Sequence, residues 1–273
     1  MSGGPADAED HIVEMEGITK TFGEVVALEG VDLHLRRNEV LALAGDNGAG
    51  KSTLIKCLAG AFEPDEGTIR MNGEVVRIDS PRVSKRLGIE TTFQDLAVAG
   101  NLSVTQNIFL GREDVTGPSG LFGVLDKRSM RERARELLED LEIGVDVDEK
   151  VSNLSGGERQ LVAISRTMLS DPEIVIMDEP TSALSVEGAE RVLELIDRMQ
   201  EQGISIILIS HNLDYMQRAA DRIQVLHHGH NAGILDATAT SRDEIVKRMV
   251  GGMPDEERGD ADEPGSGERA AGA

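Results

Sequence analysis

The chain has 273 residues, of which 50 are Asp or Glu and 28 are Lys or Arg, so its formal net charge is −22. Such a surface repels nucleic acid and anionic lipid, so we expect no nucleic-acid partner. No apolar run approaches the roughly 20 residues that a membrane-spanning helix requires. The N-terminus lacks the basic and apolar regions of a signal peptide, so we expect a cytosolic protein unless a partner holds it at a membrane.

The basic residues include only seven Lys, against 21 Arg. An acid-rich, Lys-poor surface is typical of salt-adapted proteins, and we hypothesise a high-salt cytosol. The alternative is an ordinary acidic protein with an acidic tail. The one cysteine, Cys57, can form no intramolecular disulfide and is predicted to be a buried thiol on a helix.

The first hundred residues are predicted to consist mainly of strands. Residues 1–10 are polar, and we expect them to be flexible. Period-two alternation, continuous apolar runs and turn residues define the elements. In chain order we expect strands over 11–22, 25–35 and 39–45, a helix over about 50–60, a hairpin over 67–76 and a short strand over 88–93. Asn72-Gly73 predicts the turn of the hairpin.

The middle of the chain, from about 101 to 170, is predicted to be mostly helical, with an amphipathic helix over 130–143 and a Gly/Pro loop over 111–123. Strand-helix alternation then resumes. We expect a strand over 173–178, a helix over 186–203 and a strand over 204–210. This alternation implies a mainly parallel sheet with helices on both faces, so the helical block is read as an insertion.

The end of the chain, 253–273, is acidic and rich in Gly, Pro and Ala, so we expect it to be disordered. The predicted domain therefore covers 11–252.

The sequence GDNGAGKST, residues 45–53, fits the phosphate-binding pattern G-x-x-x-x-G-K-[ST] between a buried strand and a helix. Backbone N–H groups and the helix N-terminus would hold the phosphates, Lys51 would reach the β- and γ-phosphates, and the Ser52 hydroxyl would hold Mg²⁺. The residues expected in this loop are Gly45, Asp46, Asn47, Gly48, Ala49, Gly50, Lys51, Ser52 and Thr53. The alternative is a Gly-rich turn with an exposed lysine.

A pair of carboxylates follows the apolar strand IVIM at the expected ligand edge of the sheet. We expect Asp178 to hold Mg²⁺ directly or through water. Glu179, one residue on, is the candidate base that polarises water for attack on the γ-phosphate. A solvated acidic pair is the alternative.

A second candidate phosphate-binding element is LSGGERQ, residues 154–160. Asn153 or Ser155 can cap a helix whose first turn carries Gly156 and Gly157, and that helix N-terminus would present N–H groups to an anion. Because this element belongs to the helical insertion, we expect it to serve the nucleotide of a second molecule. The residues alone also allow a capped surface helix without a ligand.

These motifs together resemble those of the ATP-binding-cassette (ABC) ATPases, and the resemblance covers about 11–250. It implies a P-loop NTPase (RecA-like) α/β core with a mainly parallel sheet, an antiparallel β subdomain and an inserted α-helical subdomain. It also implies ATP and Mg²⁺ as ligands, and assigns Ser155, Gly156 and Gly157 to the ATP of a partner cassette.

The resemblance assigns further residues. Phe22 matches the aromatic that stacks on adenine, with a core residue as the alternative. Gln94 matches the glutamine that reaches Mg²⁺ and water and senses the membrane partner, and His211 matches the histidine that contacts the γ-phosphate. Ser185 stands where the family usually has Asp, which leaves that loop's hydrogen bonds across the dimer open.

Three histidines lie within HHGH, residues 227–230. Three His in four residues cannot all converge on one tetrahedral ion without ligands from elsewhere in the chain, so we predict a turn between two strands and no metal site.

Residues 80–113 and 237–252 resemble the ATPases of monosaccharide importers of the ribose and galactose type. The resemblance implies ATP hydrolysis coupled to solute uptake at the cytoplasmic face of the membrane, with permease subunits as partners and an extracellular solute-binding protein as an indirect one. Those ATPases often carry two cassettes in one chain, whereas this chain has one, so we expect it to pair with itself or with a separate cassette.

Three alternatives stay open at this point. A branched-chain amino-acid importer also uses single cassettes of this length. Soluble ABC ATPases of DNA repair or translation form a different class, but they usually carry coiled-coil insertions or linked cassettes and basic surfaces. A P-loop small-molecule kinase would leave LSGGERQ unexplained.

Overall fold

The computed structural model describes residues 11–92, 98–116 and 124–251. The predicted flexible N-terminus, the predicted acidic tail over 253–273 and the candidate glutamine Gln94 lie outside the described residues.

The centre of the molecule is a six-stranded sheet with the strand order β12-β11-β3-β10-β9-β6. Its strands are β3 (Val40–Gly45), β6 (Ile89–Thr92), β9 (Ile174–Asp178), β10 (Ser205–Ile209), β11 (Arg222–His227) and β12 (His230–Asp236). All neighbours pair in parallel except β11 and β12, which are antiparallel. The predicted mainly parallel sheet is therefore confirmed.

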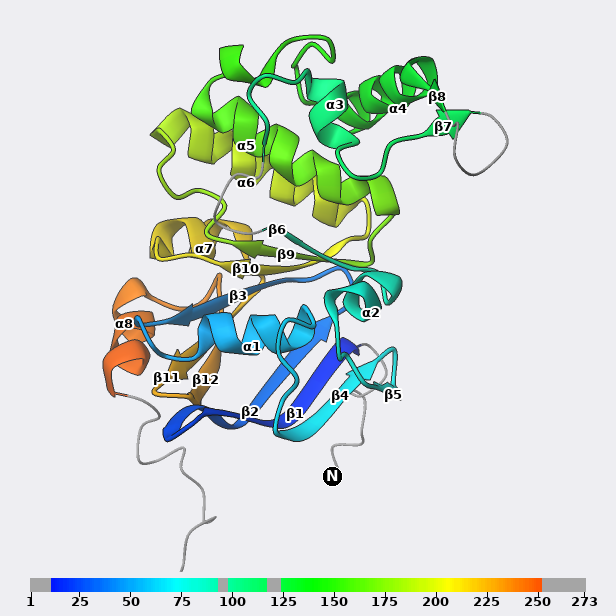
Figure 1. Ribbon diagram of the computed structural model, residues 1–273. Coiled ribbons are helices and arrows are strands. Elements are labelled where there is room, and N and C mark those ends of the chain that lie inside the picture. The colour runs from blue at the N-terminus through cyan, green and yellow to red at the C-terminus, as the bar shows by residue number, and fades with distance from the viewer. Residues whose placement is uncertain (1–10, 93–97, 117–123, 252–273) are drawn as a thin grey trace, which may run out of the picture.

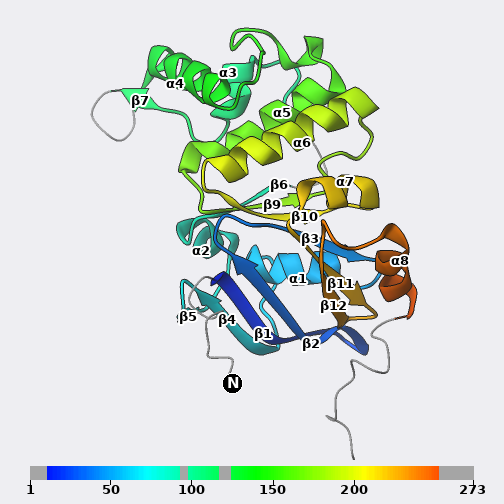
Figure 2. The same ribbon diagram turned by 180° about the vertical axis from the view of Figure 1, so that it is seen from behind.

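Both faces of this sheet are buried, which explains why its strands are continuous apolar runs. Along β3, Val40, Ala42 and Ala44 enter one apolar core, whereas Leu41 and Leu43 enter another. The first core is completed by α5 (Gly156–Ser165), α6 (Val186–Glu201) and α7 (Leu213–Ala219), and the second by α1 (Lys51–Leu58) and an antiparallel sheet. The layers are visible in Figures 1 and 2, with α5 and α6 on the opposite side of the sheet from α1.

The antiparallel sheet has the order β2-β1-β4-β5. Its strands are β1 (His11–Phe22), β2 (Val25–Arg36), β4 (Glu66–Met71) and β5 (Glu74–Val76), which match the predicted strands and hairpin closely. Asn72 and Gly73 join β4 to β5 with φ of 52° and 79°, the left-handed conformations that such a two-residue turn requires. The antiparallel β subdomain is thus confirmed.

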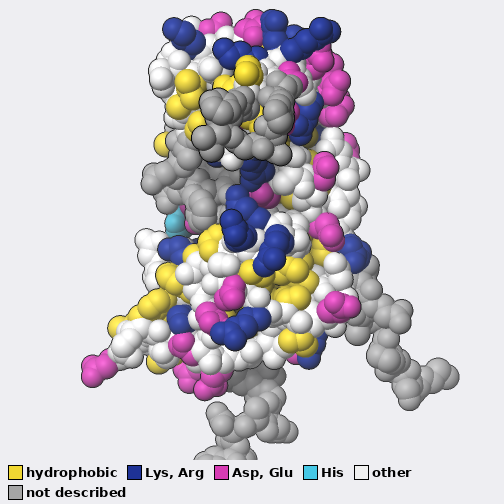
Figure 3. Space-filling view, turned by 45° about the vertical axis from the view of Figure 1, so that its right-hand side comes forward, with side chains coloured by type: hydrophobic (Ala, Val, Ile, Leu, Met, Phe, Trp, Pro, Cys, Tyr) yellow, Lys and Arg dark blue, Asp and Glu magenta, His cyan; other side chains and the backbone are white. Residues whose placement is uncertain are grey.

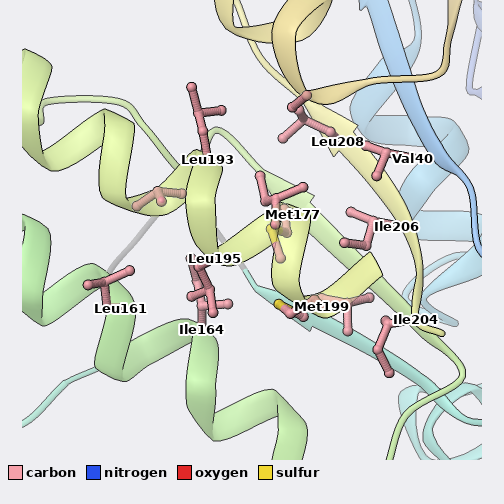
Figure 4. Packing of buried hydrophobic residues seen from close by; sticks show 14 of the residues in the cluster. Val40, Leu161, Ile164, Met177, Leu193, Leu195, Met199, Ile204, Ile206 and Leu208 are labelled. Carbon is pink, nitrogen blue, oxygen red and sulfur yellow. The ribbon is translucent and has the colours of Figure 1, made fainter. Parts of the chain in front are cut away.

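The predicted helical insertion is also present. It contains α3 (Val104–Ile108), α4 (Lys127–Asp140), α5 and the 3₁₀ segments η1 (Val151–Asn153) and η2 (Arg166–Ser170). Part of the predicted loop over 111–123 is instead strand β7 (Val115–Thr116), which pairs with β8 (Val124–Leu125). Side chains of α5, α6, β9 and β10 pack into one apolar layer, which joins the insertion to the central sheet (Figure 4).

A buried carboxylate fastens the insertion to the edge of the sheet. Glu90 of β6 accepts hydrogen bonds from Arg112 Nη2 at 2.6 Å and from Ser170 Oγ at 2.9 Å. Lys85 Nζ lies 3.4 Å from the same carboxylate. Lys85 belongs to α2 (Pro81–Arg86), a helix that the sequence analysis did not predict. Lys and Arg side chains gather over this part of the surface, although the chain as a whole is strongly acidic (Figure 3).

The C-terminal part adds α8 (Arg242–Gly251), which packs on β11 and β12. The residues 227–230 form the predicted turn between these two strands. Within the described residues, no cluster of His, Cys, Asp and Glu side chains is arranged to hold a metal ion. None of the helices in the described ranges has the length and apolar character needed to cross a bilayer.

Candidate nucleotide-binding site

The loop between β3 and α1 has the conformation of a phosphate-binding loop because of its glycines. Gly50, the N-cap of α1, has φ of 103°, and Gly45 has φ of 153°. A Cβ on Gly45 would lie 2.6 Å from Leu226 O, and one on Gly50 would lie 2.8 Å from Ala27 O. Side chains at these two positions are therefore excluded by both backbone conformation and contact.

Lys51 is buried at the first position of α1. Its Nζ donates to Gly45 O at 2.7 Å and to Asp46 O at 3.1 Å. An ammonium group has three N–H donors, so one remains for a ligand. Burial lowers the pKa of Lys51, and the carboxylate of Glu179, followed by those of Asp46 and Asp178, opposes this shift.

Of the two candidate carboxylates, Asp178 ends β9 and Glu179 follows it, and both line a cavity beside this loop. Burial raises the pKa of Asp178, opposed by Lys56 and Lys51. Burial also raises the pKa of Glu179, opposed mainly by His211. Glu179 is only 9% exposed, and its Oε1 is buried without a hydrogen-bond partner in the structure.

His211 follows β10 and faces Glu179. The backbone N–H of His211 donates to Glu179 Oε2 at 3.3 Å. The ring Nε2 lies 3.3 Å from Glu179 Oε1, although the geometry of that contact is not a hydrogen bond. The parallel pairing of β9 with β10 places Asp178 opposite Ile209, so the residues after both strands meet at one edge of the sheet.

One cavity of about 490 Å³ collects these groups. Its described lining consists of Asp46–Thr53, Asp178, Glu179, Ile209 and His211, with Val25, Val26 and Ala27 from β2. The valines are 65% and 52% exposed. The sequence analysis did not select them, because their exposure and their place beside the loop depend on how β2 packs against the rest of the chain.

Ser155 is the N-cap of α5, which decides between the two predicted caps. Ser155 Oγ accepts from Glu158 N–H at 3.3 Å, and Glu158 Oε2 accepts from Ser155 N–H at 2.8 Å. This reciprocal pair leaves the hydroxyl hydrogen of Ser155 free to donate. The N–H groups of Gly156 and Gly157 lie in the first turn, where a helix offers no internal acceptor.

Gly157 also has a packing role that the sequence did not reveal. A Cβ on Gly157 would lie 2.9 Å from Gly188 Cα, so α5 and α6 approach closely at this point. A Cβ on Gly156 would meet only Leu184 Cδ2, at an ordinary 3.7 Å. The two neighbouring glycines therefore differ in what they do for the fold.

The two candidate phosphate-binding elements of one chain lie on opposite faces of the sheet. The loop before α1 belongs to one core and α5 belongs to the other. Among the described residues that line the cavity, none comes from 154–160. One copy of the chain therefore does not bring the two elements together around one phosphate.

The structure also places the remaining candidates. Ser185 is the N-cap of α6, and its Oγ accepts from Gly188 N–H at 3.2 Å. Phe22 ends β1 and is 43% exposed, so it is not a core residue. It lies opposite Val25 in the β1–β2 ladder, at the rim of the cavity rather than in its lining. Cys57 is buried, as predicted, and burial raises its pKa to about 11.

A glycine-rich loop between a parallel strand and a helix, with two carboxylates at the end of another parallel strand of the same sheet, defines a P-loop nucleotide-binding α/β protein. The family profile "ABC transporter" matches residues 28–182. The chain belongs to the ABC transporter family, in agreement with the resemblance inferred from its motifs.

Relatives and solved structures also place the chain in the ABC transporter family. The chain is 45% identical over 240 residues to a xylose/arabinose import ATP-binding protein of Sulfolobus acidocaldarius, covering 88% of this chain and 94% of that protein. It is 44% identical over 240 residues to a ribose import ATP-binding protein of Rubrobacter xylanophilus, again covering 88% of this chain. The chain spans only 47% of that protein's length.

Among solved structures, the ADP conformation of an ATP-binding cassette of an ABC transporter is similar, with a TM-score of 0.75 and 27% identity. That comparison covers 88% of this chain and 94% of the other.

Proposed function

We propose that this chain is the ATP-hydrolysing subunit of an ABC importer and that two cassettes close around ATP to drive uptake of a monosaccharide. The observation that carries the ATPase assignment is the single cavity in which Lys51, Asp178, Glu179 and His211 converge on a phosphate-binding loop. The sugar assignment is supported by the relatives, which are named as import ATP-binding proteins for ribose and for xylose/arabinose.

The cavity suits a nucleoside triphosphate. Its loop offers backbone N–H groups and the N-terminus of α1, both of which favour an anion. The buried ammonium group of Lys51 adds a positive charge beside them. The exposed side chains of Val25 and Val26 form an apolar wall of the same cavity.

Mg²⁺ also suits the residues present, because hydroxyl and carboxylate oxygens are its preferred protein ligands. Ser52 and Asp178 both line the cavity and would hold the ion. When bound, Mg²⁺ supplies positive charge that neutralises the phosphate oxygens. Gln94 stays a proposed third ligand outside the described residues.

Glu179 is the proposed general base. A carboxyl group that burial protects from solvent is more basic than an ordinary glutamate. Its Oε1, beside the His211 ring, makes no hydrogen bond within the protein and can accept one from an attacking water molecule. The N–H of His211 holds the other oxygen and so fixes the orientation of the carboxylate.

The second cassette supplies the N-terminus of α5. In this proposal Ser155, Gly156 and Gly157 of one copy contact the ATP held by the loop of the other, because the two elements of a single chain lie on opposite faces. Ser185 is the N-cap of α6, close to this element. Serine and aspartate serve equally well as N-caps, so Ser185 can fill the capping role of the usual aspartate.

The proposed partners are permease subunits at the cytoplasmic face of the cell membrane, with an extracellular solute-binding protein acting through them. Radiolabelled ribose and leucine uptake into vesicles that contain the reconstituted transporter distinguishes a sugar importer from a branched-chain amino-acid importer. Uptake of leucine but not ribose or another monosaccharide would reject the sugar assignment.

The substitution Glu179→Gln tests the ATPase assignment. We expect ATP affinity to be retained and hydrolysis to fall by about 100- to 10,000-fold, the usual contribution of a general base. Steady-state phosphate release and nucleotide binding measure the two effects. Wild-type turnover in this variant would show that another group activates the water.

A further inference from the structure

The segment that joins α1 to β4 contacts the candidate base-stacking residue. The rings of Phe22 and Phe62 lie with their centroids 5.1 Å apart and their planes at 69°, an edge-to-face arrangement. Such pairs are favourable beyond the area they bury and have a preferred orientation. Phe62 therefore restrains the direction in which the exposed ring of Phe22 faces.

The same segment holds the backbone beside Phe22. Asp65 accepts hydrogen bonds from Lys20 Nζ at 2.6 Å, from Thr21 N–H at 2.7 Å and from Thr21 Oγ1 at 2.8 Å. In addition, Asp65 N–H donates to Thr19 O at 2.8 Å. The last residues of β1 are thus attached to the segment by four hydrogen bonds that involve one aspartate.

Phe62 is in turn held by α1. The N–H groups of Ala61 and Phe62 donate to Lys56 O at 2.9 and 3.1 Å. Lys56 Nζ lies 5.7 Å from the centroid of the Phe62 ring, within reach of a cation–π interaction. Because α1 begins at Lys51, the helix links the phosphate-binding loop to the aromatic pair.

Phe22 lies beside the cavity, next to a residue that lines it. It is the last residue of β1 and pairs with Val25, which lines the cavity. Its ring is exposed at the rim, so part of its surface is available to a ligand.

We propose that Phe62 and Asp65 are positioning residues that hold the ring of Phe22 against the base of the nucleotide. This inference rests on the proposed ATPase function, because it needs a nucleotide in the cavity. A ring fixed in its binding orientation loses less conformational entropy when the base stacks on it. The attachment to α1 further makes the base-binding ring and the phosphate-binding loop one connected unit.

The first experiment compares ATP with inorganic tripolyphosphate, which has phosphates and no base. Phe62→Ala is expected to raise the KM and Kd for ATP about three- to tenfold and to leave kcat unchanged. This fold-change corresponds to the free energy of one aromatic pair. Tripolyphosphate competition should be unaffected. Phe62→Tyr should restore ATP affinity, and Val75→Ala, at an exposed position of β5, is the matched control.

The second experiment is a double-mutant cycle with Phe22→Ala. If Phe62 acts through Phe22, the double variant should bind ATP as weakly as Phe22→Ala alone. Additive losses would overturn the inference, and so would unchanged ATP affinity in Phe62→Ala. If Phe62→Ala fails to fold, Asp65→Asn takes its place in the cycle, with the same two criteria.

The controls separate this inference from the function on which it rests. If wild type binds ATP and Lys51→Ala does not, while the Phe22 and Phe62 variants bind like wild type, the positioning role is rejected and the ATPase assignment stands. If wild type does not bind ATP, both are rejected.

Discussion

Glu179 combines two unfavourable features that a purely structural residue would avoid. Its φ of 53° lies in the left-handed region, which costs a non-glycine residue about 1–3 kcal/mol. Its N–H donates to Ile209 O at 2.9 Å, and its carbonyl accepts from Ser182 N–H and Oγ, so the surrounding backbone enforces this conformation. Together with the buried Oε1, which makes no hydrogen bond within the protein, this strain supports the role proposed for Glu179.

The raised pKa of Glu179 has a consequence for stability. A carboxyl group whose pKa is higher in the folded protein binds its proton more tightly there, so the free energy of unfolding decreases as pH rises above the ordinary value. The charge of Glu179 thus destabilises the fold at neutral pH. We predict that Glu179→Gln melts at a higher temperature than wild type at pH 7.5, by about 2–4 °C for each kcal/mol gained.

The pH dependence is the check on this prediction. The difference in melting temperature should shrink as pH falls through the raised pKa of the folded protein, because the wild-type carboxyl group is then protonated and no longer carries its charge. Differential scanning calorimetry at several pH values measures it. A difference that is independent of pH would mean that the charge of Glu179 is not its cause.

Sequence reasoning found the chemical groups of the site but not all of their surroundings. Lys51, Asp178 and Glu179 follow strands in a recognisable pattern, and β3, β9 and β10 bring those strand ends to one edge of the sheet. The valine wall from β2 and the contact between Phe22 and Phe62 depend on which segments pack together. Such contacts between residues far apart in the sequence leave no local pattern.

At the scale of elements, α5 also shows that local signals can be predicted from the sequence whereas contacts between distant residues cannot. The sequence predicted its N-cap at Asn153 or Ser155, because residues of these types before a helix are a local signal. The close approach of Gly157 to Gly188 was not predictable, since it arises from the packing of α5 against α6. Strand β7 was likewise missed, because two residues are too few for alternation to be detected.

The pair Gly156 and Gly157 allows a matched comparison. Gly157→Ala places a Cβ 2.9 Å from Gly188 Cα, so we predict a loss of about 1–3 kcal/mol in the free energy of unfolding. Gly156→Ala meets only an ordinary contact, and alanine favours a helix over glycine, so its stability should not fall. Urea denaturation of both variants measures the difference. Equal stabilities would contradict the packing role of Gly157.

At the scale of the whole molecule, the large negative net charge affects both the stability of the fold and the pairing of two copies. The chain carries −22 in total, and closing two copies around ATP would bring two such charges together. Self-repulsion of this kind destabilises compact states and is screened by salt. This repulsion connects the composition to both stability and pairing.

Melting curves in about 50 mM and about 2 M KCl test the salt dependence. We predict that the melting temperature rises with KCl, because screening relieves repulsion among the acidic side chains. Na⁺ in place of K⁺ is the control for a specific ion effect. Equal melting temperatures at both concentrations would contradict the hypothesis of salt adaptation.

The most direct test of the central claim is the mass of Glu179→Gln in solution with ATP, measured by analytical ultracentrifugation. We predict a dimer at saturating ATP and single subunits without nucleotide, because each ATP is proposed to lie between the loop of one copy and the α5 N-terminus of the other. Adding Ser155→Arg, which blocks that N-terminus, should abolish the dimer. Single subunits at saturating ATP, or a dimer that persists with Ser155→Arg, would contradict the account.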